Sequence, residues 1–276
     1  MDFAQDWRKE TFPMHRVLVG LVILIALACA TCAQELRVAA AADLQFAMLD
    51  LAAQFEKQTG TKMNVSYGSS GNFFSQIQNG APFDLFFSAD SAYPKNLDAA
   101  GLAEPRTLYT YAVGRIVLWM PSDAKIDLSR EKWHALLDAR VLKIAIANPE
   151  HAPYGRAAVA ALKKAGVYER VETKLVFGEN ISQAAQFVQS GNAQVGIIAL
   201  SLTVSPGMKD GQRWEIPADF HPPIEQTAVI LRSAANKDGA RAFLAFIKSA
   251  PGRAILSNYG FTLPSVSAAP AAPDKN

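Results

Sequence analysis

Four short segments of the chain combine residue types that suit the capture of a small anion. They are AAADLQFAM (40–48), YGSSGNFFSQI (67–77), NPEHAPYGRAAVAAL (148–162) and FGENISQAAQF (177–187). In each segment an apolar run or a short loop gives way to a sequence that favours a helix. The first turn of a helix has unpaired N–H groups and a partial positive charge, which together attract an oxyanion. These residues therefore indicate a site for a negatively charged ligand.

The residues at the second and third junctions are small or carry hydroxyl groups. Gly68, Gly71 and Gly155 permit backbone turns that bring N–H groups to one point, and Ser69 and Ser70 add hydroxyl donors. A single junction of this kind is more often an ordinary capped helix, because Asp, Ser and Asn are common N-caps. Four junctions in one chain favour a ligand site, but the residues alone do not identify the anion.

The elements that must position these junctions alternate along the chain. Apolar runs predict strands at 36–42, 62–67, 83–89, 115–120, 142–147, 174–177, 195–200 and 227–232. Between them apolar residues recur at helical spacing, and one long helix is expected over 238–256. Continuous apolar strands interleaved with amphipathic helices indicate an α/β fold with mainly parallel sheets flanked by helices. Ligands of such sheets lie beyond the carboxyl ends of the strands, where the four junctions fall.

Two sets of these units indicate two lobes with a ligand cleft between them. We expect the first lobe to comprise residues 34–113 and 227–264, and the second lobe to comprise residues 114–226. The extended crossovers near Val113 and Gln226 would then act as hinges. The Ala/Pro-rich tail over 265–276 has no periodicity, and we expect it to be disordered.

The N-terminal segment has the pattern of a secretory signal peptide. A basic start at 15–16 precedes an apolar run over 17–30, and the small residues Thr31 and Ala33 suit signal peptidase. We expect cleavage after Ala33, with Ala30 as the alternative, so that residues 1–33 are removed and the mature protein is periplasmic.

The same segment contains both cysteines of the chain. With Cys29 and Cys32 removed, the mature protein can form neither a disulfide nor a thiolate metal site. A lipid anchor at Cys29 is not expected, because Ala26 stands where a lipoprotein signal has Leu. Met14 is an alternative start that would leave residues 1–13 untranslated.

Charge and composition argue against several other classes of protein. The formal net charge is +2 over 276 residues, without a basic stripe, so nucleic-acid binding is not expected. His134, His151 and His221 are scattered without carboxylates at ligand spacing, so neither a zinc site nor a cofactor is expected. An exported serine hydrolase using Ser70 and His221 is the alternative from another class, although GSSG (68–71) lacks the G-x-S-x-G spacing.

The first three segments, together with GAPFDLFFSAD (80–90), QVGIIA (194–199) and NYGF (258–261), resemble the molybdate-binding proteins of ABC importers. These are type II periplasmic solute-binding proteins, and the resemblance extends from Arg37 to Phe261. It implies a two-lobe fold that captures molybdate or tungstate by lobe closure, without catalysis. It also implies a monomer that delivers the anion to the membrane permease of an ABC importer.

The resemblance assigns ligand-binding roles residue by residue. The serine of the second loop falls on Ser70, beside Ser69, and two backbone donors fall on Tyr154 and Ile181. Two positions depart from the family. Asp43 stands where the first loop often has a serine, and Ala199 stands where a tyrosine often donates its hydroxyl.

Asp43 poses an electrostatic problem for an anion site. At ~4 Å and an effective dielectric constant of about 20, a carboxylate repels a unit negative charge by ~4 kcal/mol. We expect Asp43 to cap its own helix, with Arg156 neutralising it across the cleft. The alternative is a ligand that is not a simple dianion, such as a different oxyanion or a small organic acid.

Overall fold

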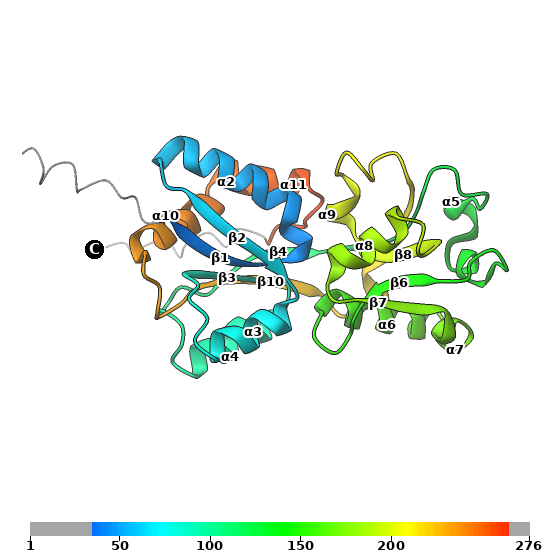
Figure 1. Ribbon diagram of the computed structural model, residues 1–276, viewed down its shortest axis with the longest axis horizontal. Coiled ribbons are helices and arrows are strands. Elements are labelled where there is room, and N and C mark those ends of the chain that lie inside the picture. The colour runs from blue at the N-terminus through cyan, green and yellow to red at the C-terminus, as the bar shows by residue number, and fades with distance from the viewer. Residues whose placement is uncertain (1–34, 265–276) are drawn as a thin grey trace, which may run out of the picture. The chain divides into compact units, whose positions relative to one another are not determined.

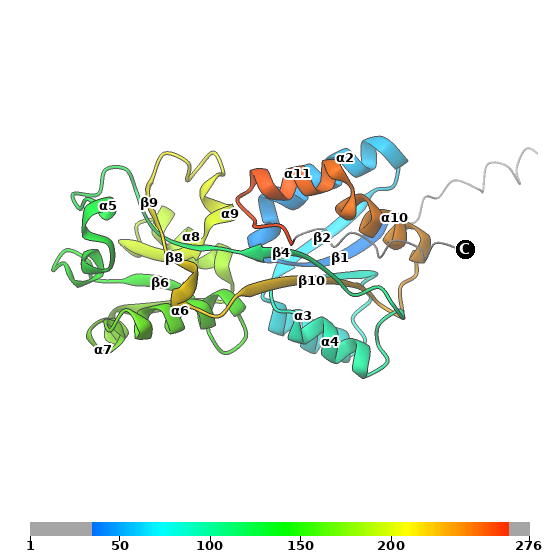
Figure 2. The ribbon, with the colours of Figure 1, turned by 180° about the vertical axis from the view of Figure 1, so that it is seen from behind.

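The computed structural model of the protein describes residues 35–264 (Figures 1 and 2). The predicted signal peptide, its cleavage site and the predicted disordered tail lie outside the described residues. Within 35–264, no helix combines the length and the apolar character that crossing a bilayer requires.

The first sheet has five strands in the order β2-β1-β3-β10-β4. The strands are β1 (Leu36–Ala41), β2 (Met63–Gly68), β3 (Leu85–Ser88), β4 (Tyr109–Gly114) and β10 (Ile224–Ile230). Its helices are η2 (Ala42–Leu44), α2 (Gln45–Thr59), α3 (Ser70–Gln78), α4 (Ala92–Ala99), α10 (Lys237–Lys248) and α11 (Ala250–Asn258). Helices α2, α10 and α11 cover one face, and α3 and α4 cover the other (Figure 1).

The second sheet has five strands in the order β7-β6-β8-β5-β9. The strands are β5 (Ile116–Met120), β6 (Ile144–Ala147), β7 (Leu175–Gly178), β8 (Val195–Ala199) and β9 (Gln212–Glu215). The helical segments are α5 (Leu128–Glu131), η3 (Lys132–Leu137), α6 (Pro153–Lys164), α7 (Tyr168–Val171), η4 (Glu172–Lys174), α8 (Ile181–Gln189), α9 (Leu200–Thr203) and η5 (Ala218–Phe220). Helices α6 and α8 lie on opposite faces of this sheet (Figures 1 and 2).

The α/β class and the two helix-flanked sheets are confirmed, but the sheets are mixed rather than mainly parallel. Strand β1 pairs in parallel with β2 and β3, whereas β10 is antiparallel to β3 and β4. In the second sheet β6 is parallel to β7 and β8, whereas β5 is antiparallel to β8 and β9. The apolar pattern of a buried strand is the same in both directions, so it does not reveal this mixture.

Two segments carry the chain between the sheets. Strand β4 ends at Gly114 and β5 begins at Ile116, so a single residue separates a strand of one sheet from a strand of the other. The chain returns between the end of β9 at Glu215 and the start of β10 at Ile224. The hinge role of these segments and the lobe boundaries stay predictions.

The helix predicted over 238–256 is two helices, α10 and α11. Ser249 separates them: its hydroxyl donates to the carbonyl of Phe246 at 2.6 Å and accepts from the N–H of Gly252 at 3.4 Å. Pro251, in the first turn of α11, has no N–H and cannot continue α10. The cap and the proline therefore stop one helix and start the next.

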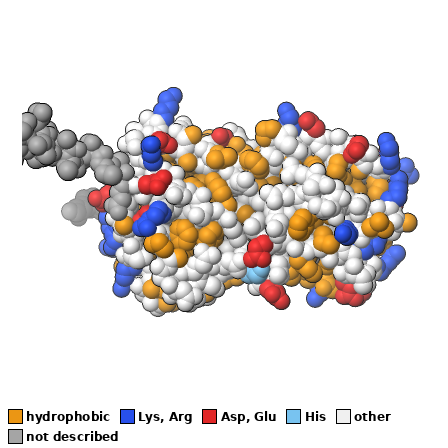
Figure 3. All heavy atoms as spheres, viewed as in Figure 1, with side chains coloured by type: hydrophobic (Ala, Val, Ile, Leu, Met, Phe, Trp, Pro, Cys, Tyr) orange, Lys and Arg blue, Asp and Glu red, His pale blue; other side chains and the backbone are white. Residues whose placement is uncertain are grey.

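The surface drawn in Figure 3 shows how charge is distributed on one face of the molecule. Lys and Arg side chains on this face lie mainly toward its two ends and form no continuous patch. This face therefore lacks the basic stripe that nucleic acids bind.

Gly155 allows α6 to start close to the end of β6. A Cβ at this position would overlap the carbonyl oxygen of Ala147 and approach the backbone of Pro149. We expect Gly155→Ala to lower the free energy of unfolding by about 1–3 kcal/mol, because backbone cannot move aside as a side chain does. Urea denaturation followed by circular dichroism measures the difference.

Gly207→Ala is the matched control for this substitution. Its Cβ would meet only the end of the Gln189 side chain, so the free energy of unfolding should change by about 0.5 kcal/mol or less. Equal denaturation midpoints for the two variants would contradict the tight packing inferred at Gly155.

Candidate functional site

A small cavity of about 10 Å³ lies where η2, α3, α6 and α8 begin. The five residues predicted to bind the ligand all line it: Asp43, Ser69, Ser70, Tyr154 and Ile181. The fold thus brings together residues that are distant in sequence and come from both sheets. Their role in binding stays a prediction, whereas their convergence on one cavity is a feature of the structure.

Three of these residues occupy the first turns of their helices. Ser70 begins α3, Ile181 begins α8, and Tyr154 follows Pro153 at the start of α6. First-turn N–H groups have no carbonyl one turn earlier to accept their hydrogen bonds. Pro153 has no N–H, so Tyr154 provides the first backbone donor of α6. Three helix starts therefore direct N–H groups and partial positive charge toward the cavity.

The serines add hydroxyl groups at the start of α3. Ser69 caps this helix by accepting from the N–H of Asn72 at 3.4 Å. The Ser70 hydroxyl accepts from the N–H of Ala89 at 2.9 Å and keeps its own hydrogen available to donate. Both side chains are buried, so their orientation is set by packing.

Asp43 adopts neither of the predicted arrangements. The side chain caps no helix, because neither η2 nor α2 has a side-chain cap. Asp43 lies inside the turn of η2 rather than before α2, so its carboxyl points across to α6. There Oδ2 accepts from the Tyr154 hydroxyl at 2.9 Å and also from the Gln226 amide. The prediction that Asp43 caps its own helix is therefore wrong.

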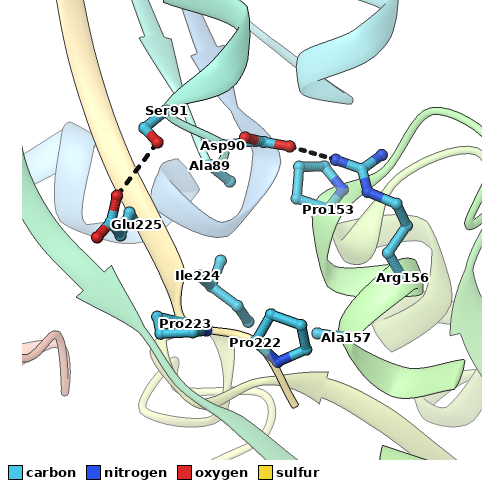
Figure 4. Close-up of a pocket in the computed structure, with 10 residues that line it drawn as sticks. All are labelled: Ala89, Asp90, Ser91, Pro153, Arg156, Ala157, Pro222, Pro223, Ile224 and Glu225. Atoms are coloured by element: carbon cyan, nitrogen blue, oxygen red, sulfur yellow. Dashed lines mark hydrogen bonds and ion pairs between the residues drawn. The ribbon is translucent and has the colours of Figure 1, made fainter. Parts of the chain in front are cut away.

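The predicted pairing of Arg156 with Asp43 is also wrong. Arg156 forms an ion pair with Asp90 at 2.5 Å and lies over the ring of Tyr93, 5.8 Å from its centroid. It follows Tyr154 by two positions, which places it on a different face of α6. The guanidinium therefore points into a neighbouring groove instead of the cavity (Figure 4).

A buried chain of hydrogen bonds holds the Asp43 carboxyl. The Tyr111 hydroxyl donates to Oε1 of Gln226 at 2.7 Å, and Nε2 of Gln226 donates to the Tyr154 hydroxyl at 2.9 Å. The same Nε2 donates to Oδ2 of Asp43, whereas Oδ1 of Asp43 has no partner among the described residues. Tyr111 and Gln226 are site residues that the sequence did not predict. Their only signal was a polar group within the strand-like segments YTYAVG and IEQTAVI.

Burial dominates the acid–base behaviour of this network. Asp43 is only 1% exposed, and burial raises its pKa to about 6, although the hydrogen bonds from Gln226 and Tyr154 oppose the rise. Burial, together with the nearby Asp43 carboxyl, raises the pKa of Tyr154 and of Tyr111 well above 10, so both hydroxyls stay protonated at neutral pH.

Contacts between the helices of the two sheets enclose the cavity. The N–H of Gly71 donates to the carbonyl of His151 at 3.0 Å, and Nδ1 of His151 lies 3.1 Å from the Ser69 hydroxyl. Ser182 donates to the carbonyl of Ala42 at 2.9 Å, and Ser201 donates to the carbonyl of Asp43 at 2.7 Å. Each bond joins an element of the first sheet to an element of the second, so the described structure is closed around the cavity.

A larger groove of about 280 Å³ adjoins the cavity, and Ala89 and Pro153 line both (Figure 4). The ion pair between Asp90 and Arg156 crosses this groove, and Ser91 donates to Glu225 at 3.2 Å. The groove is thus lined by both acidic and basic side chains, and the guanidinium of Arg156 is already paired with Asp90.

The predicted serine–histidine pair is not formed in the structure. Nδ1 of His221 contacts the carbonyl oxygen of Pro222. Both residues are far along the chain from the segments that line the cavity. His151 instead contacts Ser69, and its Nε2 lies 3.6 Å from Glu179. Within residues 35–264 no cluster of His, Cys, Asp and Glu has the arrangement of a metal site.

The raised pKa of Asp43 predicts a pH-dependent effect of Asp43→Asn on the stability of the ligand-free protein. Below pH 3.8 the carboxyl is protonated in both the folded and the unfolded states. Between that value and about 6 only the folded state keeps the proton, so wild-type stability falls as pH rises. We therefore expect Asp43→Asn to stabilise the fold by up to ~3 kcal/mol above about pH 6, and by little below about pH 4.

Urea denaturation at about pH 7.5 and about pH 4.5 measures this difference. Asp123→Asn removes an exposed carboxylate and serves as the control, with no such dependence expected. An Asp43→Asn variant that is less stable than wild type at both pH values would refute the assignment of a destabilising buried charge.

Comparison with known proteins gives a consistent assignment. The family model of bacterial extracellular solute-binding proteins matches residues 36–262. The molybdate-binding protein ModA of Azotobacter vinelandii is 41% identical over 255 residues, which cover 92% of this chain and 99% of the relative. ModA of Rhodobacter capsulatus is 40% identical over 242 residues, which cover 88% of this chain and 94% of the relative.

The structural comparison agrees with the sequence comparison. The solved periplasmic molybdate-binding protein of Azotobacter vinelandii superposes with a TM-score of 0.78 at 37% identity. The match covers 83% of this chain and 99% of that protein. The chain therefore belongs to the bacterial extracellular solute-binding protein family.

Proposed function

We propose that this chain is an exported solute-binding protein that captures molybdate or tungstate and delivers it to the membrane permease of an ABC importer. The observation that carries the proposal is the convergence of helix starts and two serine hydroxyls on one cavity. Relatives named as molybdate-binding proteins over nearly their whole length support the identity of the ligand.

The size of the cavity favours an inorganic oxyanion over an organic acid. Its volume of about 10 Å³ lies far below the roughly 300–1,000 Å³ that is usual for pockets holding drug-sized ligands. Backbone N–H groups of Tyr154 and Ile181 and the hydroxyls of Ser69 and Ser70 replace the water around the anion. Since such donors are fixed in place, selectivity follows from the radius of the anion.

Capture proceeds by closure of two lobes, residues 34–113 with 227–264 and residues 114–226. The segments near Val113 and Gln226 act as hinges, because the chain passes between the sheets just after β4 and just before β10. Bonds such as that from Gly71 to His151 and the ion pair between Asp90 and Arg156 form only when the lobes meet. The mature protein acts as a periplasmic monomer after removal of residues 1–33, without a cofactor and without catalysis.

Binding of molybdate is tested by isothermal titration calorimetry of the mature protein. We expect tight 1:1 binding of molybdate and tungstate and weaker binding of sulfate and phosphate. Ser70→Ala removes a hydroxyl donor and should weaken molybdate binding by about 10- to 100-fold, which corresponds to ~1.4–2.8 kcal/mol.

Ser75→Ala is the matched control, because Ser75 is an exposed serine on the same helix. It should leave the dissociation constant unchanged. Equal effects of the two substitutions would exclude Ser70 from the site, and no heat from wild type with either metal oxyanion would refute the proposed function.

A second function is favoured by one specific contact set. Ser69, His151 and Glu179 follow one another as nucleophile, base and acid do in a hydrolase, with distances of 3.1 and 3.6 Å. A panel of ester substrates separates the two functions. The binding proposal expects no turnover from wild type, whereas turnover that disappears in Ser69→Ala would establish a hydrolase.

A further inference from the structure

We infer that the carboxyl group of Asp43 is protonated in the complex and donates a hydrogen bond from Oδ1 to the bound anion. The inference rests on the proposed function and adds to it the protonation state in which the site accepts its ligand. Asp43 then acts as a hydroxyl-like donor in a position where the molybdate-binding proteins often have a serine.

The direction of the buried hydrogen bonds leads to this assignment. Because the Tyr111 hydroxyl donates to Oε1 of Gln226, the amide presents Nε2 to Tyr154 and Asp43. The Tyr154 hydroxyl accepts from that Nε2, so its own hydrogen goes to Oδ2 of Asp43. Oδ2 therefore receives two donors and behaves as a carbonyl oxygen.

The other carboxyl oxygen has the surroundings of an O–H group. Oδ1 is buried and has no partner among the described residues, and Asp43 lines the cavity with Tyr154 and Ile181. An ionised carboxylate would require hydrogen-bond donors at both oxygens, whereas a neutral carboxyl needs an acceptor for the hydrogen on one of them. An anion in the cavity supplies that acceptor.

Charge balance favours the neutral form as well. A carboxylate beside a dianion is repelled by both negative charges, and the repulsion is stronger in a buried site than in water. The nearby cation, Arg156, is paired with Asp90 and points into the groove. A proton on Asp43 removes the repulsion and adds a donor at the same time.

The groups that face Asp43 do not offer another source of charge. Tyr154 of α6 and Tyr111 of β4 are the titratable groups around its carboxyl, and both remain neutral. Helices α8 and α9, which pack against η2, carry no titratable side chain. Helix α2 and strand β2 also pack against η2. Their titratable residues do not contribute to the pKa of Asp43; these residues are Asp50, Glu56, Lys57 and Tyr67. At the cavity edge His151 faces Ser69 and Glu179.

The proton makes binding dependent on pH. Since burial raises the pKa of Asp43 to about 6, the protonated fraction of the ligand-free protein falls about tenfold for each pH unit above ~7. The apparent dissociation constant is the intrinsic one divided by the competent fraction. It should therefore rise about tenfold per pH unit, with uptake of one proton for each anion bound.

Calorimetric titration of wild type with molybdate between about pH 6.5 and about pH 8.5 tests both consequences. Pairs of buffers with different ionisation enthalpies report the number of protons taken up, which we expect to approach one at the upper end. This measurement requires no variant, so it does not depend on whether a substitution folds.

Asp43→Asn mimics the protonated side chain. The amide oxygen can accept from Tyr154 and Gln226, and the amide nitrogen can donate to the anion. We expect this variant to show no proton uptake, a dissociation constant independent of pH, and tighter binding than wild type at about pH 8.5. His151→Gln is the matched control, because a protonated imidazole beside an anion would also favour binding at low pH; it should keep the wild-type pH slope.

The possible outcomes separate this inference from the proposed function. Tight wild-type binding without proton uptake or pH slope would overturn the inference alone. So would a slope that persists in Asp43→Asn or disappears in His151→Gln. Absence of molybdate binding at every pH would instead remove the proposed function itself.

Discussion

The unpaired N–H groups at the starts of α3, α6 and α8 are the constraint around which the site is organised. Such groups need an acceptor when they are buried, and the first-turn residues Ser70, Tyr154 and Ile181 all lie at one cavity. Each helix can begin there because the strand before it ends at the same edge of its sheet. The fold thus concentrates partial positive charge without placing a cationic side chain at the centre.

The Asp43 carboxyl is best understood as part of a network that spans both sheets. Tyr111 and Gln226 belong to strands of the first sheet, whereas Tyr154 begins a helix of the second. A buried polar group is costly unless it is hydrogen-bonded, so the chain from Tyr111 to Asp43 also ties the two halves together. The packing that closes the structure also buries the carboxyl and so raises its pKa, whereas the hydrogen bonds from Gln226 and Tyr154 oppose the rise.

An ion pair near the site lies in the neighbouring groove and not in the cavity. Arg156 and Asp90 neutralise each other there, on the far side of Ala89 and Pro153, which line both spaces. A free guanidinium in the cavity would attract any anion regardless of size. By contrast, fixed N–H and hydroxyl donors in a small volume discriminate by radius, because they cannot follow a smaller guest.

The sequence by itself determined the local features: the strand and helix segments, the helix starts, the serines at the second junction and the resemblance to a family of anion-binding proteins. Periodicity and capping depend on residues that are close together in the chain, so they can be interpreted without a structure. Only the tertiary structure decided strand direction and the partners of Asp43 and Arg156. Asp43 is 111 positions from Tyr154 along the chain and 183 positions from Gln226. No local pattern specifies contacts between residues so far apart in sequence. The cavity and the hydrogen-bond network form only when the two sheets pack together. A polar residue in an apolar strand, such as Gln226, therefore could not be assigned to the site from the sequence alone.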